Sequence, residues 1–197
     1  MKNNNLFVIV SAIPALLLLV TGCVVTSVYP YYTEMDIVFE QALLGDWTDG
    51  KSDSNTNEAG RVEQSGQMGY RLTSLGENET NSVNFHVFRL GQQLFMDMCP
   101  TNQSLELLPT HQLQKIKRTG ATLEMASLNY DWLEKLLEKN PKAIRHMVLQ
   151  KKNEQHQSDR IVLTADTAEL QKFVLKYLNN TNAWSEPSLI KVKSAAR

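Results

Sequence analysis

The chain has 197 residues and a formal net charge of −1, with 20 Lys and Arg against 21 Asp and Glu. A balance this close to neutral gives no electrostatic reason to expect nucleic acid or an acidic substrate as a partner. The two short basic runs, 115–118 and 151–152, are typical of solvated strand ends and turns. The length that follows the N-terminal segment is sufficient for one domain with its own hydrophobic core.

The N-terminal segment has the organisation of a secretory signal. Lys2 is the one charged side chain of a short polar head, and a 15-residue apolar run follows from Leu6 to Val20. This run is shorter than the roughly 20 residues that a helix needs to span a bilayer. It therefore predicts a segment that is removed in processing and lies outside the fold.

The motif at 20–23, Val-Thr-Gly-Cys, resembles the lipobox of bacterial lipoproteins, with Val20 where Leu is commonest. The resemblance implies cleavage between Gly22 and Cys23, a diacylglyceryl group on the Cys23 sulfur and an acyl chain such as palmitate on the new α-amine. Two or three acyl chains hold a soluble domain stably at a bilayer. An ordinary secretory signal and an uncleaved anchor are the alternatives.

The resemblance also implies a location. Val24 is not the Asp that favours retention at the inner membrane, so we expect the cell envelope, with the domain at the outer membrane facing the periplasm. The partner implied is the membrane itself, through the lipid on Cys23. The next segment, 23–42, is expected to be a tether. Its tyrosines, at 29, 31 and 32, are expected to pack on the domain, with the headgroup boundary as the alternative.

The sequence Gly45-Asp46-Trp47 resembles the Gly-x-Trp signature of lipocalins. The resemblance implies an eight-stranded antiparallel barrel in which Trp47 closes one end and Gly45 lets the backbone pass close to it. A core tryptophan in some other β domain is the alternative. The absence of the other lipocalin motifs limits this resemblance to architecture, so it carries no function with it.

Short alternating runs predict a series of antiparallel strands after a polar loop at 51–63. Tight turns at Gly91 and Gly120 predict two hairpins, and a third is expected around a polar loop at 152–159. With the strand at Trp47, the expected strands number about eight and lie at 68–72, 84–90, 94–98, 111–118, 121–128, 146–151 and 160–164.

Two helices are expected beside these strands. Each begins with an acid followed by Glu three residues later, Asp131 with Glu134 and Asp166 with Glu169, as in a capping box. The second helix carries an apolar stripe at helical spacing, which predicts packing against the barrel rather than on a membrane. The stripe consists of Leu170, Phe173, Val174, Tyr177 and Leu178.

The fold expected is therefore mainly β, an antiparallel sheet or barrel of about eight strands with one inserted helix and one C-terminal amphipathic helix. The domain organisation expected is a signal peptide at 1–22, a tether at 23–42, a lipocalin-like domain at 43–180 and a loose tail at 181–197.

No familiar catalytic motif follows the lipobox: the sequence has no Gly-rich phosphate loop, no Cys-x-x-Cys, no His-Glu-x-x-His and no Gly-x-Ser-x-Gly. His86 and His111 are expected on neighbouring strands, but no acid is in register to complete a metal site. Asp97 alternates with apolar residues and is expected to face solvent; facing inward, it would be the best acid candidate. Cys99 is expected to be a half-buried structural thiol, with a reactive or intermolecular thiol as the alternative. We expect no enzyme activity, no metal and no cofactor.

The leading functional expectation is a membrane-tethered, non-catalytic module that binds a small apolar or amphipathic ligand. A filled core would use the same residues that would line such a cavity. An assembly protein that docks another envelope protein is the second hypothesis, and a hydrolase with a dispersed site is the third. The candidate lining residues are Trp47, Met68, Tyr70, Phe88 and Met96.

Overall fold

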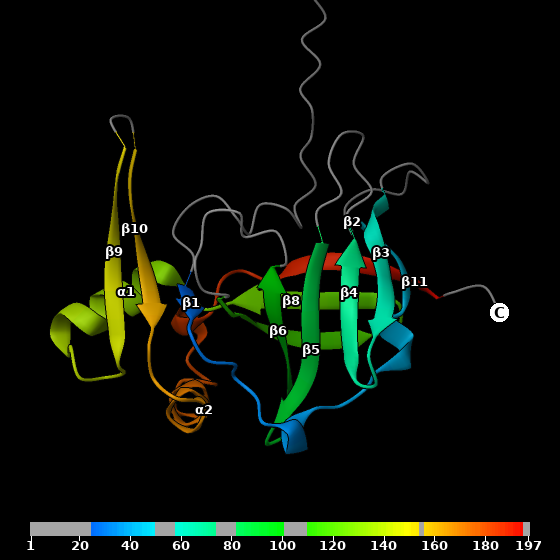
Figure 1. The fold of residues 1–197 in the computed structure, drawn as a ribbon, viewed down its shortest axis with the longest axis horizontal. Helices are drawn as coiled ribbons and strands as arrows, with labels where there is room; N and C mark the ends of the chain where they lie inside the picture. The colour runs from blue at the N-terminus through cyan, green and yellow to red at the C-terminus, as the bar shows by residue number, and fades with distance from the viewer. Residues whose placement is uncertain (1–24, 50–57, 74–81, 101–109, 154–155, 195–197) are drawn as a thin grey trace, which may run out of the picture.

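The computed structural model describes residues 25–49, 58–73, 82–100, 110–153 and 156–194. The protein is mainly β, with a closed eight-stranded antiparallel barrel, a separate three-stranded sheet and two helices (Figure 1). Among the described helices, none has both the length and the apolar character needed to cross a membrane.

The barrel is an up-and-down meander in which each strand pairs with its neighbours along the chain, and the last strand closes it. The predicted hairpins at Gly91 and Gly120 are confirmed. The barrel strands are β2 (Gly45–Asp49), β3 (Glu58–Ser65), β4 (Gly69–Thr73), β5 (Ser82–Leu90), β6 (Gln93–Pro100), β7 (Gln112–Thr119), β8 (Thr122–Ser127) and β11 (Ser188–Ser194).

Two barrel strands lie where the sequence predicted irregular chain. The expected polar loop at 51–63 contains the first part of β3, and the expected loose tail at 181–197 contains β11. β3 gives a weak hydrophobic signal because its inward positions include a glycine. A Cβ on Gly60 would lie 2.7 Å from the carbonyl oxygen of Thr73, so the close approach of β4 requires glycine there. β11 pairs Val192 with Trp47 and thereby closes the barrel.

The second sheet has the order β1-β10-β9, formed by β1 (Val25–Ser27), β9 (His146–Asn153) and β10 (His156–Leu163). β1 runs parallel to β10, and β9 and β10 form a hairpin. The third predicted hairpin is confirmed as a hairpin, but the expected loop at 152–159 is wrong, because β9 continues to Asn153 and β10 begins at His156. Its expected place among the barrel strands is also wrong. A hairpin has the same local pattern in any sheet, so the sequence could not assign it to one.

The two helices bracket the β9–β10 hairpin along the chain: α1 (Tyr130–Lys139) follows β8, and α2 (Thr167–Lys176) follows β10. Asp166 caps α2 as predicted, because its side chain accepts a hydrogen bond from the backbone N–H of Glu169. The cap of α1 is Asn129 instead of Asp131; its Oδ1 accepts from the N–H of Trp132 at 3.1 Å.

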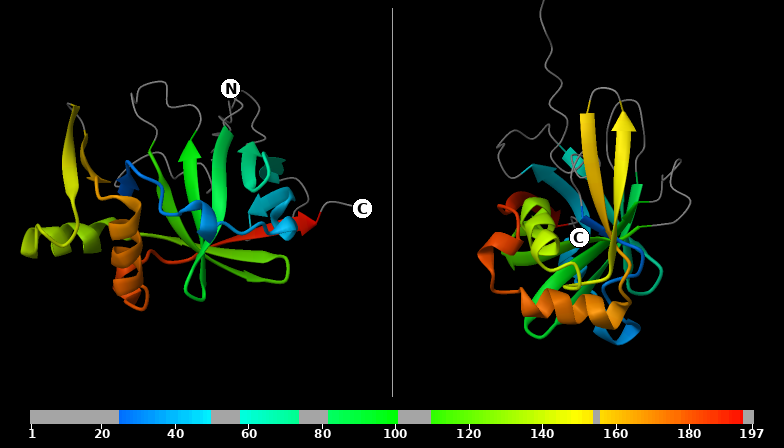
Figure 2. Two further views of the ribbon diagram at one scale, coloured as in Figure 1. Left: turned by 60° about the horizontal axis from the view of Figure 1, so that its bottom comes forward. Right: turned by 90° about the vertical axis from the view of Figure 1, so that its left-hand side faces the viewer.

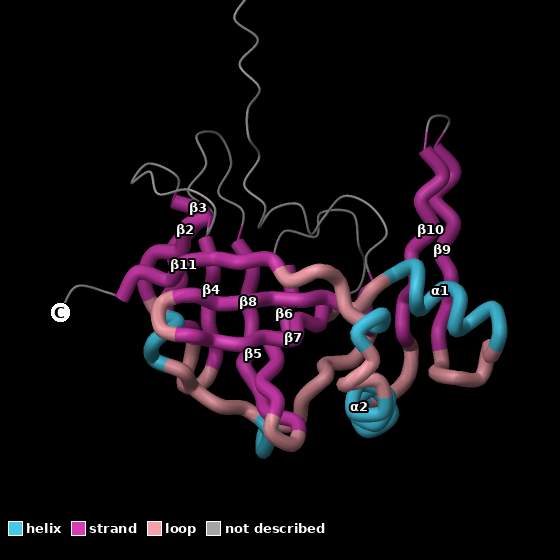
Figure 3. The backbone as a smooth tube through the Cα atoms, turned by 180° about the vertical axis from the view of Figure 1, so that it is seen from behind, coloured by secondary structure: helices cyan, strands magenta, loops and turns pink. Residues whose placement is uncertain are grey.

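The buried apolar residues form two separate clusters. The barrel interior core is enclosed by the barrel strands and consists of Leu43, Trp47, Val62, Tyr70, Leu72, Phe85, Val87, Met96, Met98, Ile116, Leu123, Met125, Ile190 and Val192. The junction core lies between the outer face of the barrel, the two helices and the second sheet, and its members include Tyr31, Phe88, Phe95, Leu113, Leu133, Ile161, Leu170, Phe173 and Trp184. Figure 3 shows the barrel and the β9–β10 hairpin at opposite ends of the molecule.

Candidate functional site

The segment 25–44, which we call the N-terminal strap, crosses the outer face of the barrel (Figure 2, left). At one end Ser27 exchanges two backbone hydrogen bonds of 2.9 Å with His111, just before β7. At the other, the N–H of Val38 donates to the carbonyl of Val87 on β5 at 2.9 Å. The expected tether is therefore part of the folded domain from Val25 onward.

The aromatic residues of the strap divide between core and surface. Tyr31 is fully buried in the junction core and Tyr32 is half-buried, which confirms for both the prediction that they pack on the domain. Tyr29 remains exposed. Burial raises the pKa of the Tyr32 hydroxyl to about 12, so this group keeps its proton at neutral pH.

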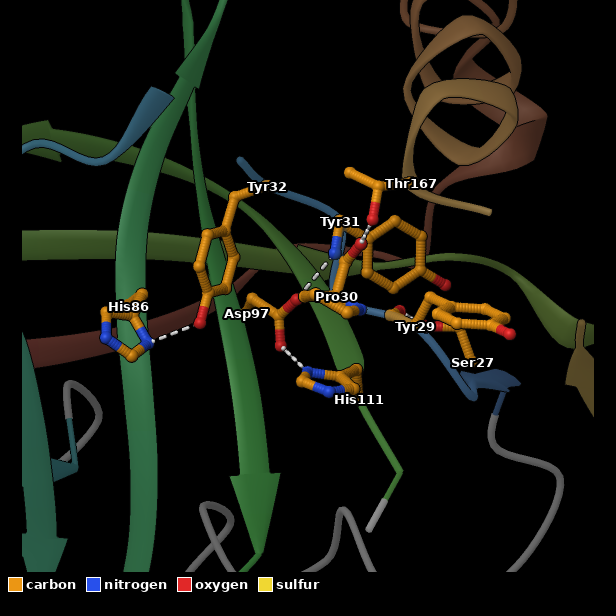
Figure 4. Close-up of polar contacts among 9 residues, drawn as sticks. All are labelled: Ser27, Tyr29, Pro30, Tyr31, Tyr32, His86, Asp97, His111 and Thr167. Atoms are coloured by element: carbon orange, nitrogen blue, oxygen red, sulfur yellow. Dashed lines mark hydrogen bonds and ion pairs between the residues drawn. The ribbon is translucent and has the colours of Figure 1, made fainter. Parts of the chain in front are cut away.

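Asp97 on β6 lies at the centre of the contact between the strap and the barrel (Figure 4). Its carboxylate Oδ2 accepts the backbone N–H of Tyr31 at 2.8 Å, and its Oδ1 lies 2.7 Å from Nδ1 of His111. The side chain is only 2% exposed, so the prediction that Asp97 faces solvent is wrong. It does point to the outer face of the barrel, but the strap covers that face.

His86 on β5 stands directly opposite Asp97, and its Nδ1 lies 2.8 Å from the hydroxyl of Tyr32 (Figure 4). Burial lowers the pKa of His86; nearby His111 lowers it further, while the charge of Asp97 acts in the opposite direction. In the neutral tautomer that carries its proton on Nε2, the Nδ1 of His86 accepts a hydrogen bond from the hydroxyl of Tyr32. The prediction that His86 and His111 lie on neighbouring strands is wrong, because β6 separates them.

Helix α2 fastens the strap from the other side. The hydroxyl of Thr167 donates to the carbonyl of Pro30 at 2.7 Å. The side-chain amide of Gln171 donates to the carbonyl of Tyr31 at 3.1 Å and to the carboxylate of Asp36 at 2.8 Å. Side chains of β6 and α2 thus form hydrogen bonds with the same two residues of the strap, Pro30 and Tyr31.

The Asp97–His111 pair could in principle orient a general base, as in hydrolases. In the part of the chain that the structure describes, no hydroxyl or thiol is hydrogen-bonded to the ring of His111. The same residues contain no group of three or more potential metal ligands. Burial raises the pKa of the half-buried Cys99, which disfavours its reactive thiolate. The contacts of Asp97 with Tyr31 and His111 join the strap to the barrel, and we call this cluster the latch.

The residues predicted to line a cavity lie in three different places. Trp47, Tyr70 and Met96 are fully buried in the barrel interior core. Phe88 belongs to the junction core, outside the barrel. Met68 precedes β4 in an exposed turn, with 39% of its surface accessible. Gly22 and Cys23 lie outside the described residues.

Large side chains occupy the barrel interior. The indole N–H of Trp47 donates to the carbonyl of Leu43 at 2.8 Å, and the rings of Tyr70 and Phe85 stack at 4.7 Å. Two buried glutamines that the sequence analysis did not single out, Gln112 and Gln114, share the inward face of β7 with Ile116. In the sequence, only their alternation with Leu113 and Lys115 along β7 could have indicated that these glutamines face inward.

Comparison of the chain with protein-family models, with curated proteins and with solved structures finds no match. The function must therefore be inferred from the geometry of the molecule itself.

Proposed function

We propose that this chain is an envelope lipoprotein, cleaved after Gly22 and held by acyl chains on Cys23 at the periplasmic face of the outer membrane. There it would act without catalysis, as a module that docks another envelope protein. The strap supports this proposal, because the chain enters β1 at Val25, only two residues after the proposed anchor. The domain would therefore be held close to the membrane, without a long linker.

The free edge of β9 is the observation that carries the docking proposal. β9 is the outermost strand of the second sheet and pairs with β10 alone among the described strands. Met147, Val148 and Leu149 are exposed by 47%, 49% and 48%. An open strand edge with exposed apolar side chains can take an added strand from another chain: the backbone groups supply hydrogen bonds and the side chains supply contact area.

We also propose that the barrel is lipocalin-like. In support, Gly45 adopts a positive φ of 120°, which favours glycine, as it leads the chain into β2. Two residues later Trp47 is fully buried, and its indole N–H donates a hydrogen bond to the carbonyl of Leu43. The interior is nevertheless occupied by the protein's own side chains, and this favours docking over the storage of a ligand.

Two measurements test the proposal. Cys23→Ala is expected to release the protein from membranes; a variant that still fractionates with them would contradict the anchor. For docking, a photo-crosslinking amino acid at Val148 is expected to give a discrete protein adduct in intact cells. The matched control is Leu175, an equally exposed residue on α2. Equal labelling from both positions would contradict a docking role for β9.

A small amphipathic ligand is the second candidate, and the inward glutamines favour it. Gln112 pairs across the sheet with Met98, and Gln114 with Met96, so two amides and two flexible thioethers share one wall of the barrel. Such a wall combines apolar surface with a few polar groups, as ligand sites do. Native mass spectrometry of the protein purified from membranes is expected to retain the ligand, and Gln114→Leu to weaken its binding.

A further inference from the structure

We infer that the β9–β10 hairpin rests against the headgroup layer of the leaflet that holds the lipid on Cys23. This inference depends on the proposed anchor and adds a second, protein-mediated contact with the same membrane. It follows from the strand register and the length of the chain.

The register fixes how far the anchor lies from the second sheet. In that sheet Val25 pairs with Ile161, and Ile161 pairs with Val148, so these three residues form one row across β1, β10 and β9. Cys23 precedes Val25 by two residues, which span at most about 7 Å of fully extended chain. The lipid attachment point is therefore held within that distance of the row.

The hairpin extends well beyond this row. β9 continues to Asn153 and β10 begins at His156, five residues past Val148 and Ile161, or about 17 Å of strand. Because β1 and β10 are parallel, the hairpin extends toward the side from which the chain enters β1. In Figure 1 the hairpin projects past the described ends of the barrel strands on that side.

Because the connection to Cys23 is short and the hairpin is long, the hairpin lies close to the membrane surface. The headgroup layer of one leaflet is about 6 Å thick, which is much less than the length of the projecting hairpin. An upright hairpin would carry the open edge of β9 into the hydrocarbon, where unpaired backbone groups are not tolerated. A hairpin that lies obliquely against the headgroups keeps this edge out of the hydrocarbon, and this is the arrangement that we infer.

This contact is compatible with the docking edge proposed above. It uses the distal parts of β9 and β10, whereas the exposed apolar residues, 147–149, lie near the base of the hairpin. A partner at the base would meet the protein close to the membrane surface, at a height fixed by the anchor.

The test uses the acylated protein in vesicles of phosphatidylethanolamine and phosphatidylglycerol. In a Cys99→Ala background, Asn153→Cys carries a fluorophore on the hairpin. Gln92→Cys carries it on the β5–β6 turn, at the opposite end of the molecule (Figure 1). We expect quenching by headgroup-spin-labelled lipid to be several-fold stronger at position 153 than at 92. Gln157→Cys on β10 repeats the measurement if the first variant does not fold.

The outcomes separate the two proposals. Equal quenching at 153 and 92, with the protein still floating with the vesicles, overturns the hairpin contact and leaves the anchor intact. Failure of the acylated protein to float overturns both. A further variant with a 12-residue Gly-Ser insertion between Val24 and Val25 is expected to keep flotation but lose most of the quenching at 153. Undiminished quenching there would overturn the claim that the short connection imposes the contact.

Discussion

The barrel interior core and the junction core are both well buried, but they are built in different ways. In the barrel, most pairing strands follow one another along the chain, and the interior is filled mainly by apolar side chains, with Gln112 and Gln114 on one wall. In the junction, segments as distant as Tyr31, Phe95 and Phe173 meet in one cluster. Polar side chains hold these segments in place, chiefly Asp97, Thr167 and Gln171.

The difference shows how the strap is held on the barrel. Apolar packing alone would stabilise the strap without fixing its position along the barrel surface, because hydrophobic burial is non-directional. Hydrogen bonds have preferred distances and angles. The N–H of Tyr31 donates to Asp97 and its carbonyl accepts from Gln171, so these two bonds fix the strap at one residue. The junction is therefore the part of the molecule that fixes the path of the strap across the barrel.

The largest effect is expected in the barrel. Trp47→Ala should lower the free energy of unfolding by about 4 kcal/mol, because it removes a large, fully buried ring from the interior. Trp132→Ala in the junction should cost clearly less, since that ring is only partly buried against Phe173 and Tyr177. Urea denaturation measures both, and equal losses would mean that the two cores contribute alike.

The next effect is expected at the latch. Asp97→Ala should cost about 3 kcal/mol, because it leaves the buried N–H of Tyr31 and the ring of His111 without their acceptor. Hydrogen exchange should show the amide of Tyr31 losing protection before the amides of β5 and β6. Asp131→Ala, at an exposed position on α1, is the control and should change stability by less than about 0.5 kcal/mol. Uniform loss of protection throughout the barrel would contradict a local latch.

A smaller loss is expected where α2 meets the strap. Thr167→Val keeps the shape of the side chain and removes the hydrogen bond to the carbonyl of Pro30, so it should cost about 1 kcal/mol. Chemical denaturation measures the loss. In a double-mutant cycle, Thr167→Val and Asp97→Ala should couple because they act on adjacent residues of the strap. If the two losses of stability simply add, the hydrogen bonds of Thr167 and Asp97 hold the strap independently.

The smallest effect is expected from pH. Burial lowers the pKa of His86 below its usual 6.5, so the unfolded chain binds a proton more readily than the folded one. Stability should therefore fall as the pH drops below 6.5, and His86→Gln should flatten that dependence. NMR titration of the His86 ring checks the cause directly. A measured pKa at or above 6.5 would remove the explanation.

The sequence-based predictions were accurate for features that depend on neighbouring residues and inaccurate for those that depend on distant segments. The hairpins at Gly91 and Gly120, the third hairpin and the apolar stripe of α2 could be predicted because each depends on residues close together in the chain. β3 escaped prediction because Gly60 takes one of its few inward positions. Asp97 was assigned to solvent because alternation shows which side of a strand a residue faces, but not what covers that side.

The sequence by itself determined the local elements: the strand periods, the tight turns, the cap of α2 and the motif at 20–23. Only the tertiary structure decided that β11 closes the barrel, that the third hairpin joins a separate sheet, and that a strap covers the outer face of β6. The physical reason is that strand and helix periods are set within a few residues, whereas barrel closure and the burial of Asp97 depend on segments dozens of residues away.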